Sequence, residues 1–433
     1  MRVFVNRGRC QNCSQTIIDI CWVCGAQPLP HRCEFPSPSR RQLEPMSLTL
    51  PRNTGPRHHQ AVSVVSATML IGTASMLVMG VEPILLGGLA NAGRISEAGV
   101  GQAAMIEVFA LAAGSTAGPF LMNLGHMRAK VAAASLLLAI INLAIYWAAS
   151  PATILVQRGA AGLLEGLLLG AAGAILTHND RPERMSGLLL GLSTIPQVIA
   201  AYLLPIWVIP RFGVDAGFAV LAGVAMASCL VAPAIVDHVP APTGSHHGRV
   251  VVSPALMVVA LAAFLQNAGI GAAWNYLERL AAQHHFAPAT VGAAIAGSLA
   301  FQVAGALAAS WLGARVHART VLAAGAVLQA GLVIGLLHAG TPVALIASAC
   351  GFGLFWLALQ PFLVADVIAL EPSRTAAVLL APLALVGFSA GPLAASFVID
   401  DNRVGGAFQV SAGSSLRRRR STSWPAPGGG RLL

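Results

Sequence analysis

The stretch RGAAGLLEG, residues 158–166, places an arginine and a glutamate inside a long apolar run. The run covers residues 152–176, which is long enough to cross a hydrocarbon core of about 30 Å as a helix. A charged side chain in the middle of a bilayer costs about 2.5–3.5 kcal/mol on insertion scales. We therefore expect Arg158 and Glu165 to face the interior of a helix bundle or water.

Composition places the whole chain in the same setting. Of its 433 residues, 56% are hydrophobic and 10% are charged, whereas soluble domains are about half apolar and a quarter charged. Repeated apolar stretches predict an all-α polytopic membrane protein, as written with about 11 transmembrane helices where 12 are expected. The predicted spans are about 61–88, 98–122, 131–149, 152–176, 186–208, 214–236, 253–276, 288–313, 319–338, 341–366 and 375–398.

Basic residues in the connectors indicate the orientation. With a cytoplasmic N-terminus, the cytoplasmic connectors carry Arg128, Lys130, Arg181, Arg184, Arg249, Arg315, Arg319 and Arg374, and the others carry Arg94, Arg211, Arg279 and Arg403. This bias predicts a plasma membrane protein, in a bacterium an inner membrane protein, with its N-terminus in the cytoplasm. The net charge of +10 is then a signal of topology and lipid headgroups, and no nucleic acid is expected as a partner.

The chain divides into two halves joined by a polar linker. Residues 61–236 form a six-helix half, 237–252 a cytoplasmic linker and 253–398 a half of five helices. We expect residues 1–60 to be a disordered cytoplasmic extension or the result of a start placed before Met46. Residues 399–433, with four successive arginines, have the composition of no span. We expect them to be an aberrant tail that replaces a twelfth helix, through a frameshift or truncation, and a genuine eleven-span variant is the alternative.

The two halves repeat each other in part. A Val-Gly pair opens the second span at Val100 and the eighth at Val291. An arginine follows each pair at the same separation, Arg128 in the first half and Arg319 in the second. Parallel repeats of this kind are how one large class of transporters is built.

The fourth span carries an arginine with glycines four and eight residues later, Arg158, Gly162 and Gly166. In this pattern and in its two-part layout, the sequence resembles the major facilitator superfamily. The loop GPFLMNLGHMRAK, residues 118–130, matches the family's loop signature only in degraded form, without its acidic residue. The resemblance covers about 61–398. It implies a bundle of two pseudo-repeated halves, transport by alternating access and a part in coupling for the fourth-span arginine.

Four ionisable residues lie within predicted spans of the first half: Glu82, Glu107, Arg158 and Glu165. Arg158 and Glu165 are two turns apart on one helix face, and Glu107 lies at a depth comparable with Arg158, so those two can pair. Without a counter-charge, a buried carboxyl favours its protonated form and becomes a proton carrier. We predict that these four residues form a proton-coupling charge network. Structural contacts between helices, or an interfacial place for Glu82, are the alternatives.

Glycines at four-residue spacing predict close helix packing. They are Gly162, Gly166 and Gly170 in the fourth span and Gly387 and Gly391 in the eleventh. Pro392 completes a Gly-Pro pair in the eleventh span, and the superfamily's drug antiporters carry such a pair in the fifth. Here the fifth span has Pro196 without a preceding glycine. A packing kink is the alternative, so the direction of transport stays open.

Neutral polar and aromatic residues take the place of charges in the second half. The predicted solute-lining residues are Gln266, Asn267, Trp274, Gln302, Trp356 and Gln360. Amides can orient a solute because each has donor and acceptor groups, while hydrogen bonds between helices are the alternative. Trp274 opens the cluster WNYLER at the end of the seventh span, which is typical of either an aromatic belt or an outer gate.

Cysteines and catalytic motifs give weaker signals. Cys10, Cys13, Cys21 and Cys24 form two Cys-x2-Cys pairs, but only seven residues separate the pairs, fewer than in ordinary zinc ribbons. We therefore predict no metal site and keep these four as weak candidates. The sequence has no HExxH, phosphate-loop or GxSxG motif, so we predict neither enzymatic activity nor a cofactor.

Together these features predict a secondary active transporter that moves a small organic solute, coupled to protons as a symporter. Drug-type efflux antiport is the runner-up. The expected partners are the solute, protons and the lipid bilayer, and the chain is expected to be a monomer. The alternative from another class is a non-transporting membrane sensor or scaffold with a Cys-rich, metal-binding N-terminal segment.

Overall fold

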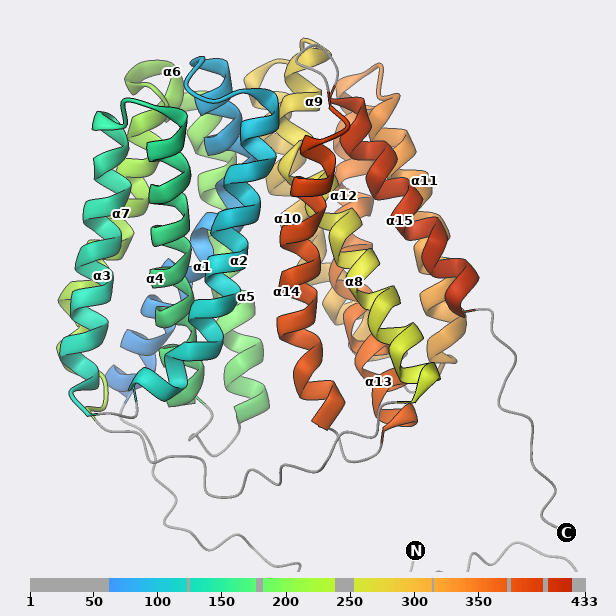
Figure 1. The fold of residues 1–433 in the computed structure, drawn as a ribbon, viewed down its shortest axis with the longest axis horizontal. Helices are drawn as coiled ribbons and strands as arrows, with labels where there is room; N and C mark the ends of the chain where they lie inside the picture. The colour runs from blue at the N-terminus through green and yellow to red at the C-terminus, as the bar shows by residue number, and fades with distance from the viewer. Residues whose placement is uncertain are drawn as a thin grey trace, which may run out of the picture. The chain divides into compact units, whose positions relative to one another are not determined.

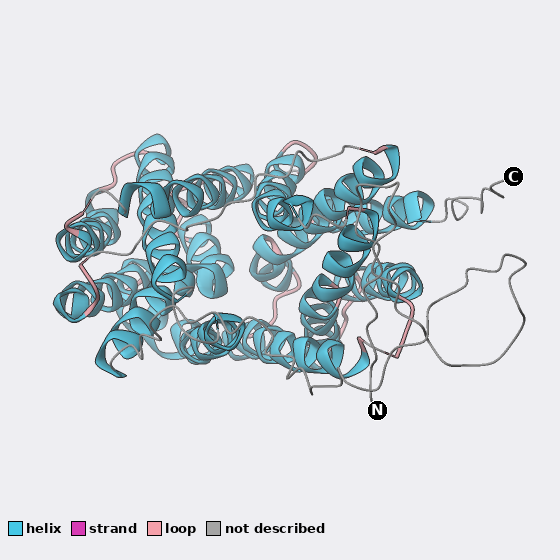
Figure 2. Cartoon of the chain, turned by 90° about the horizontal axis from the view of Figure 1, so that it is seen from below, coloured by secondary structure: helices cyan, strands magenta, loops and turns pink. Residues whose placement is uncertain are grey.

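Nearly all residues that the structure describes are helical, and none of them forms a strand (Figure 2). The structure is a computed structural model, and it describes residues 62–122, 125–176, 182–237, 253–313, 315–371, 375–399 and 404–422. The weak metal candidates Cys10, Cys13, Cys21 and Cys24 lie outside the described residues, as does most of the predicted linker.

The first half contains six spans. Its helices are α1 (Val62–Asn91), α2 (Glu97–Met122), α3 (Met127–Leu143), α4 (Pro151–Leu176), α5 (Pro182–Leu203), α6 (Ile209–Phe212) and α7 (Val214–Val231). A π-helical turn, Leu204–Val208, joins α5 to α6, so that the three form one span. This turn contains Pro205, which lacks the N–H that a regular α-helix requires.

The second half begins after the linker. Its helices are α8 (Pro254–Asn275), α9 (Leu277–Gln283), α10 (Pro288–Leu312), α11 (Ala318–Leu337), α12 (Pro342–Ala358), α13 (Gln360–Leu370), α14 (Thr375–Ser396) and α15 (Gly405–Thr422). Proline starts α8, α10 and α12, a position where its missing N–H would have no partner in the helix. Ser253 and Thr341 cap α8 and α12 by accepting hydrogen bonds from the backbone N–H groups of Leu256 and Ala344.

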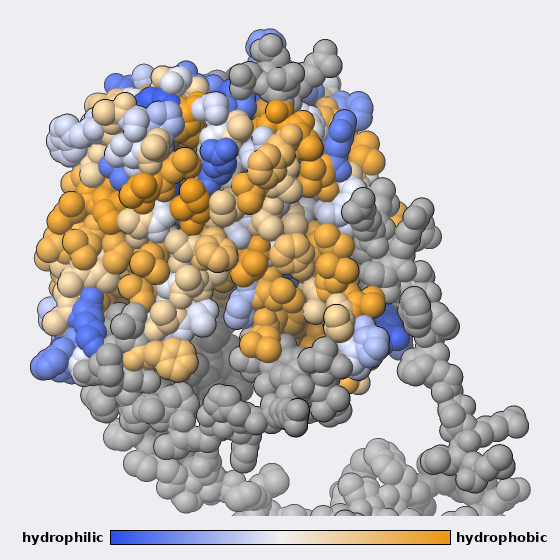
Figure 3. All heavy atoms as spheres, in the orientation of Figure 1, coloured by the Kyte–Doolittle hydropathy of each residue, from blue (hydrophilic) through white to orange (hydrophobic). Residues whose placement is uncertain are grey.

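Eleven segments among the described residues are long and apolar enough to cross a membrane, and they coincide with the eleven predicted spans to within a few residues. Apolar side chains cover the middle of the face seen in Figure 3, while hydrophilic residues gather toward its upper and lower margins. This distribution fits a bundle whose middle is surrounded by lipid.

The same helix pairs recur in both halves (Figure 1). In the first half α2 packs on α4, α1 on α5 and α3 on α7. In the second half α10 packs on α12, α8 on α14 and α11 on α15. The halves meet where α2 contacts α14 and α5 contacts α10. The structure thus has the two pseudo-repeated halves expected from the sequence.

The tail takes part in this repeat. Helix α15 holds in the second half the place that α7 holds in the first, and its Val404 flank, Ala407 and Phe408 are buried. Helix α15 is nevertheless not one of the eleven apolar segments, because its sequence contains the four arginines Arg417–Arg420. The expectation that 399–433 are an aberrant replacement of a twelfth apolar helix stays a prediction.

Candidate functional site

Four helices of the first half converge on Arg158, which is completely buried in α4. Its Nη1 donates to Oε1 of Glu107 on α2 at 3.0 Å, and its Nη2 donates to Oδ1 of Asn142 on α3 at 2.9 Å. The guanidinium carbon lies 4.7 Å from the ring centroid of Phe218 on α7, a cation–π contact. The possible contact between Glu107 and Arg158 is therefore present, while Asn142 and Phe218 are partners that sequence reasoning missed.

Glycine makes this contact possible by letting α4 approach α2. A Cβ on Gly162 would lie 2.1 Å from the backbone oxygen of Glu107, a separation that no side chain tolerates. The other four predicted packing glycines also face a neighbouring helix backbone. A Cβ would lie 2.2 Å from Leu111 O at Gly166, 2.8 Å from Ser115 O at Gly170, 2.6 Å from Phe264 O at Gly387 and 1.8 Å from Ala268 O at Gly391.

Glu82 and Glu165 lie close enough to Arg158 and Glu107 to interact with them electrostatically. Glu82 is 1% exposed and Glu165 is 2% exposed. Neither oxygen of Glu82, nor Oε2 of Glu165, has a hydrogen-bond partner among the described residues. One guanidinium therefore forms an ion pair with Glu107 and lies near two further buried carboxyl groups. A buried carboxylate without a counter-charge is costly.

Aromatic rings form a second cluster, in the other half. The ring of Trp356 on α12 stacks on Phe388 of α14 with centroids 5.4 Å apart, and it meets Trp274 of α8 edge-on at the same distance. Phe352 lies 6.2 Å from Trp356. The two predicted tryptophans are thus brought together, in a largely buried aromatic cluster built from three helices.

The predicted amides lie in separate contacts. Gln360 donates to Oδ1 of Asn267 at 3.4 Å, and Gln266 donates at 3.4 Å to Oε1 of Gln329, which sequence reasoning missed. Gln302 is buried on α10, and its Nε2 has no partner within the described part of the chain. Asn267 and Gln360 are therefore the predicted amides that the structure brings together.

Trp274 also joins the two halves. Its Nε1 donates to the backbone oxygen of Met79 in α1 at 3.0 Å. In a regular helix that oxygen would accept from the N–H of residue 83, but residue 83 is a proline and has no N–H. Pro83 thus frees a carbonyl inside the bundle, and an indole from the other half satisfies it.

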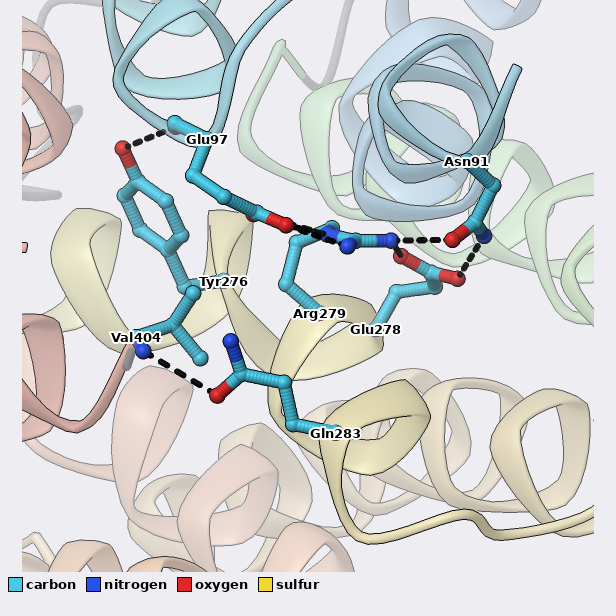
Figure 4. Close-up of polar contacts among 7 residues, drawn as sticks. All are labelled: Asn91, Glu97, Tyr276, Glu278, Arg279, Gln283 and Val404. Carbon is cyan, nitrogen blue, oxygen red and sulfur yellow. Dashed lines mark hydrogen bonds and ion pairs between the residues drawn. The ribbon is translucent and has the colours of Figure 1, made fainter. Parts of the chain in front are cut away.

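Four polar residues link the halves at one end of the bundle, and we call Asn91, Glu97, Glu278 and Arg279 the end latch (Figure 4). The Nε of Arg279 lies 3.0 and 2.8 Å from the two carboxylate oxygens of Glu97. Its Nη2 pairs with Glu97 and its Nη1 donates to Asn91 Oδ1. Asn91 in turn donates to Oε1 of Glu278 at 3.1 Å. Helices α1, α2 and α9 are therefore tied together.

Tyr276 reinforces this end of the bundle. Its hydroxyl donates to the backbone oxygen of Glu97 at 3.1 Å (Figure 4). Burial raises the pKa of Tyr276, so the phenol keeps the proton that it donates. The hydroxyl also lies where a side chain on Gly101 would begin, because a Cβ there would be 2.4 Å from it. The same Cβ would be 2.3 Å from the oxygen of Pro392, so the Gly-Pro pair of α14 packs on α2.

The end latch contains one cation and two carboxyl groups. Burial raises the pKa of Glu278 to about 7; Arg279 and Asn91 oppose this effect, and Glu97 adds to it. Burial works against the charge of Arg279, but contacts with Glu97 and Glu278 together raise its pKa, so it stays ionised. The sequence signal was the adjacent Glu278-Arg279 pair after the seventh span. It did not indicate the partners Asn91 and Glu97, which lie at the end of α1 and the start of α2.

No group of three or more His, Cys, Asp or Glu side chains in the described ranges is arranged to hold a metal ion.

Comparison with known proteins gives the fold. No protein family model and no curated protein matches the sequence. Solved structures match over most of their length. The nucleoside transporter NupG, as its D323A mutant, has a TM-score of 0.68 at 12% identity, covering 83% of this chain and 98% of its own. The xylose transporter XylE from E. coli, partially occluded and inward open, has 0.63 at 13% identity, covering 86% and 100%.

A third structure is a bacterial homologue of the human lysosomal transporter Spinster, inward-facing and occupied. Its TM-score is 0.61 at 14% identity, and the match covers 83% of this chain and 94% of the homologue. Three transporters thus share the architecture that the helix pairs and the internal repeat describe. The chain is an all-α, multi-pass membrane protein with the major facilitator fold.

Proposed function

We propose that this protein is a secondary active transporter that moves a small organic solute across the plasma membrane by alternating access, in symport with protons. The observation that carries the proposal is the buried cluster in which Arg158 pairs with Glu107 and lies near the carboxyl groups of Glu82 and Glu165. Charges inside a membrane bundle are costly and mark ion or substrate pathways in most proteins that retain them. A sensor or scaffold that used the bundle as an anchor would have no need of them.

Proton binding can be coupled to movement through Arg158. Protonation of Glu107 weakens its ion pair with Arg158, and the guanidinium is then free to turn toward Glu165, two turns along the same helix. The rearrangement changes how α2 and α4 are held together. A proton and a solute that each favour one arrangement of the halves then bias the same equilibrium.

The aromatic cluster supplies the solute-binding surface in this proposal. Trp356, which is partly exposed, offers an aromatic ring, and the Asn267–Gln360 pair offers donors and acceptors. These features favour a small amphipathic solute that has a planar apolar part and hydrogen-bonding groups. The Gly391-Pro392 pair packs against Gly101 of α2, a contact that fits either direction of transport, and drug-type efflux antiport is the runner-up to symport.

The test uses the full chain in proteoliposomes that contain a pH-sensitive dye. A panel of nucleosides, pentoses and amphipathic aromatic solutes is added with and without an imposed pH gradient. We expect at least one solute to alkalinise or acidify the lumen, and Glu107→Gln or Glu165→Gln to abolish gradient-driven accumulation while solute exchange persists. Asp215→Asn, outside the cluster, is the matched control. Normal accumulation by both Gln variants contradicts the proton role, and no movement of any solute contradicts the function.

A further inference from the structure

We infer that Glu278 is a second proton-binding residue, separate from the cluster around Arg158, and that it holds its proton only while the end latch is closed. The latch is then a pH-dependent contact between the two halves. This inference goes beyond the proposed function, since it concerns the closure of one end of the bundle and does not depend on the identity of a solute.

The geometry makes Glu278 the surplus carboxyl group of the latch. The three guanidinium nitrogens of Arg279 are engaged by Glu97 and Asn91. Oε2 of Glu278 lies 3.7 Å from Nη1 of Arg279 and has no hydrogen-bond partner among the described residues. The side chain as a whole has one hydrogen bond, from Asn91.

Helix α1 holds this oxygen away from water. A Cβ on Gly87 would lie 1.7 Å from Oε2 of Glu278, so the oxygen occupies the space that a side chain would fill. Glu278 is 8% exposed as a result. This burial requires α1 and α9 to be in contact, and any movement that parts the halves at this end exposes the carboxyl group to solvent.

Few charged groups lie near Glu278. Arg279 on α9 attracts its ionised form, Glu97 on α2 repels it, and Asn91 on α1 is neutral. Helices α8 and α10, which pack on α9, contain no Asp, Glu, His, Lys or Arg. Glu82, the only acidic residue of α1, lies five positions before Gly87, about 7.5 Å along the helix.

The direction of the pH effect follows from the two states. In the closed latch the pKa of Glu278 is about 7, against an ordinary value of 4.5 once it is exposed. The closed state binds the proton more tightly, so closure is favoured fully below the ordinary value. The preference for the closed state weakens as pH rises to about 7, and it changes little above pH 7. The ratio of open to closed molecules should rise on the order of 100-fold across this window.

The experiment measures the separation of the halves directly. Spin labels on Ala149→Cys and Gly340→Cys report the distance between exposed connectors of the two halves, in a full chain whose seven native cysteines are replaced. The protein is reconstituted in lipid nanodiscs at pH 5 and pH 8, without solute or gradient. We expect a long-distance population that grows at least about tenfold relative to the short one between the two pH values.

Variants decide whether Glu278 is responsible. Glu278→Gln mimics the protonated carboxyl group, and we expect it to stay in the short-distance population at both pH values. Asp215→Asn, which alters an ion pair within the first half, should keep the wild-type response. If the wild type is closed throughout, Trp274→Phe weakens closure elsewhere and brings the open population into range.

A pH response that persists in Glu278→Gln overturns the inference, and so does a pH-independent distance in both the wild type and Trp274→Phe. These outcomes are independent of the transport assay. Loss of the distance change would leave a proton role for Glu107 and Glu165 intact, and failure of transport would leave the distance measurement intact.

Discussion

The two halves have the same backbone contacts and different interiors. A Cβ on Gly162 of α4 would strike the backbone oxygen of Glu107, and one on Gly353 of α12 would lie 2.1 Å from that of Ser298. Both pairs are related by one offset of 191 residues, the difference between 162 and 353 and between 107 and 298. Close packing of the second and fourth helices is thus conserved between the halves, independently of the chemistry it surrounds.

At this offset Arg128 corresponds to another arginine, Arg319, but the charged residues of the cluster around Arg158 have uncharged counterparts. Glu107 corresponds to Ser298, Arg158 to Ala349 and Glu165 to Trp356. Trp356 of the aromatic cluster therefore stands where the ionic cluster of the first half has Glu165. The comparison teaches that the repeat specifies the packing of the helices, while the residues that point into the bundle differ between the halves. In our proposal the first half binds protons and the second half binds the solute.

The largest expected effect comes from removing the central cation. Arg158→Ala would leave Glu107 buried without its partner and Asn142 without a donor. Loss of one member of a buried ion pair costs about 3–5 kcal/mol, so the thermal unfolding midpoint in detergent should fall strongly. Ser298→Ala, at the counterpart of Glu107, removes a hydroxyl with no partner among the described residues and should change little. Equal midpoints for the two variants would remove the contrast between the halves.

Packing should respond equally in the two halves. Gly162→Ala and Gly353→Ala each force a methyl group against a neighbouring backbone and should each lower the free energy of unfolding by about 1–3 kcal/mol. Gly173→Ala is the matched control, because a Cβ there meets no heavy atom within 4 Å among the described residues. Chemical unfolding in mixed micelles compares the three. A much larger loss in one half would show that the shared contact is not equivalent.

A smaller effect is expected where the halves touch. Pro83→Ala supplies the N–H that a regular helix directs to the Met79 oxygen, so the hydrogen bond from Trp274 becomes redundant. Trp274→Phe removes the donor itself. A double-mutant cycle on unfolding free energies should show a coupling of about 1 kcal/mol between these positions. The combination of Trp274→Phe with Pro196→Ala, in α5, should be additive, and additivity in both cycles would contradict the proposed link.

The smallest effects belong to ion pairs in which at least one partner is partly exposed. Arg94–Asp215 lies in the first half and Arg319–Asp366 in the second, where the nitrogen and oxygen are 2.9 Å apart. Asp215→Asn and Asp366→Asn should each lower the free energy of unfolding by less than about 1 kcal/mol, and less at high salt. Thermal unfolding in about 50 mM and about 500 mM salt, between which the screening of charges increases strongly, checks this. A loss as large as that of Arg158→Ala would contradict the ranking.

Much of the bundle could be predicted because membrane spans are specified locally. Twenty successive apolar residues identify a span without reference to the rest of the chain, and the predicted spans agree with the helices to within a few residues. Glu107 and Arg158 could be paired because each is a costly charge that needs a partner at similar depth. Their role in proton coupling stays a prediction.

Other contacts had no local signal. Asn142 is one amide in an apolar span, and nothing nearby marks it as a partner of Arg158. Asn91 and Glu278 are 187 residues apart and meet only because the halves close at that end. The carbonyl of Met79 is an intermediate case. Pro83 indicates that this oxygen has no donor within its own helix, but the sequence does not identify Trp274 as the donor from elsewhere.

Gly87 has a consequence for the evolution of this chain. Its Cα leaves the space that Oε2 of Glu278 fills, and any Cβ there would lie 1.7 Å from that oxygen. In a lineage that gains a side chain at position 87, the acid at position 278 must turn away from its present place, shorten or be lost, and a lineage that loses the acid releases the glycine. The two positions should covary among related sequences, and a Gly87→Ala defect should be suppressed by a second-site change to a small residue at Glu278.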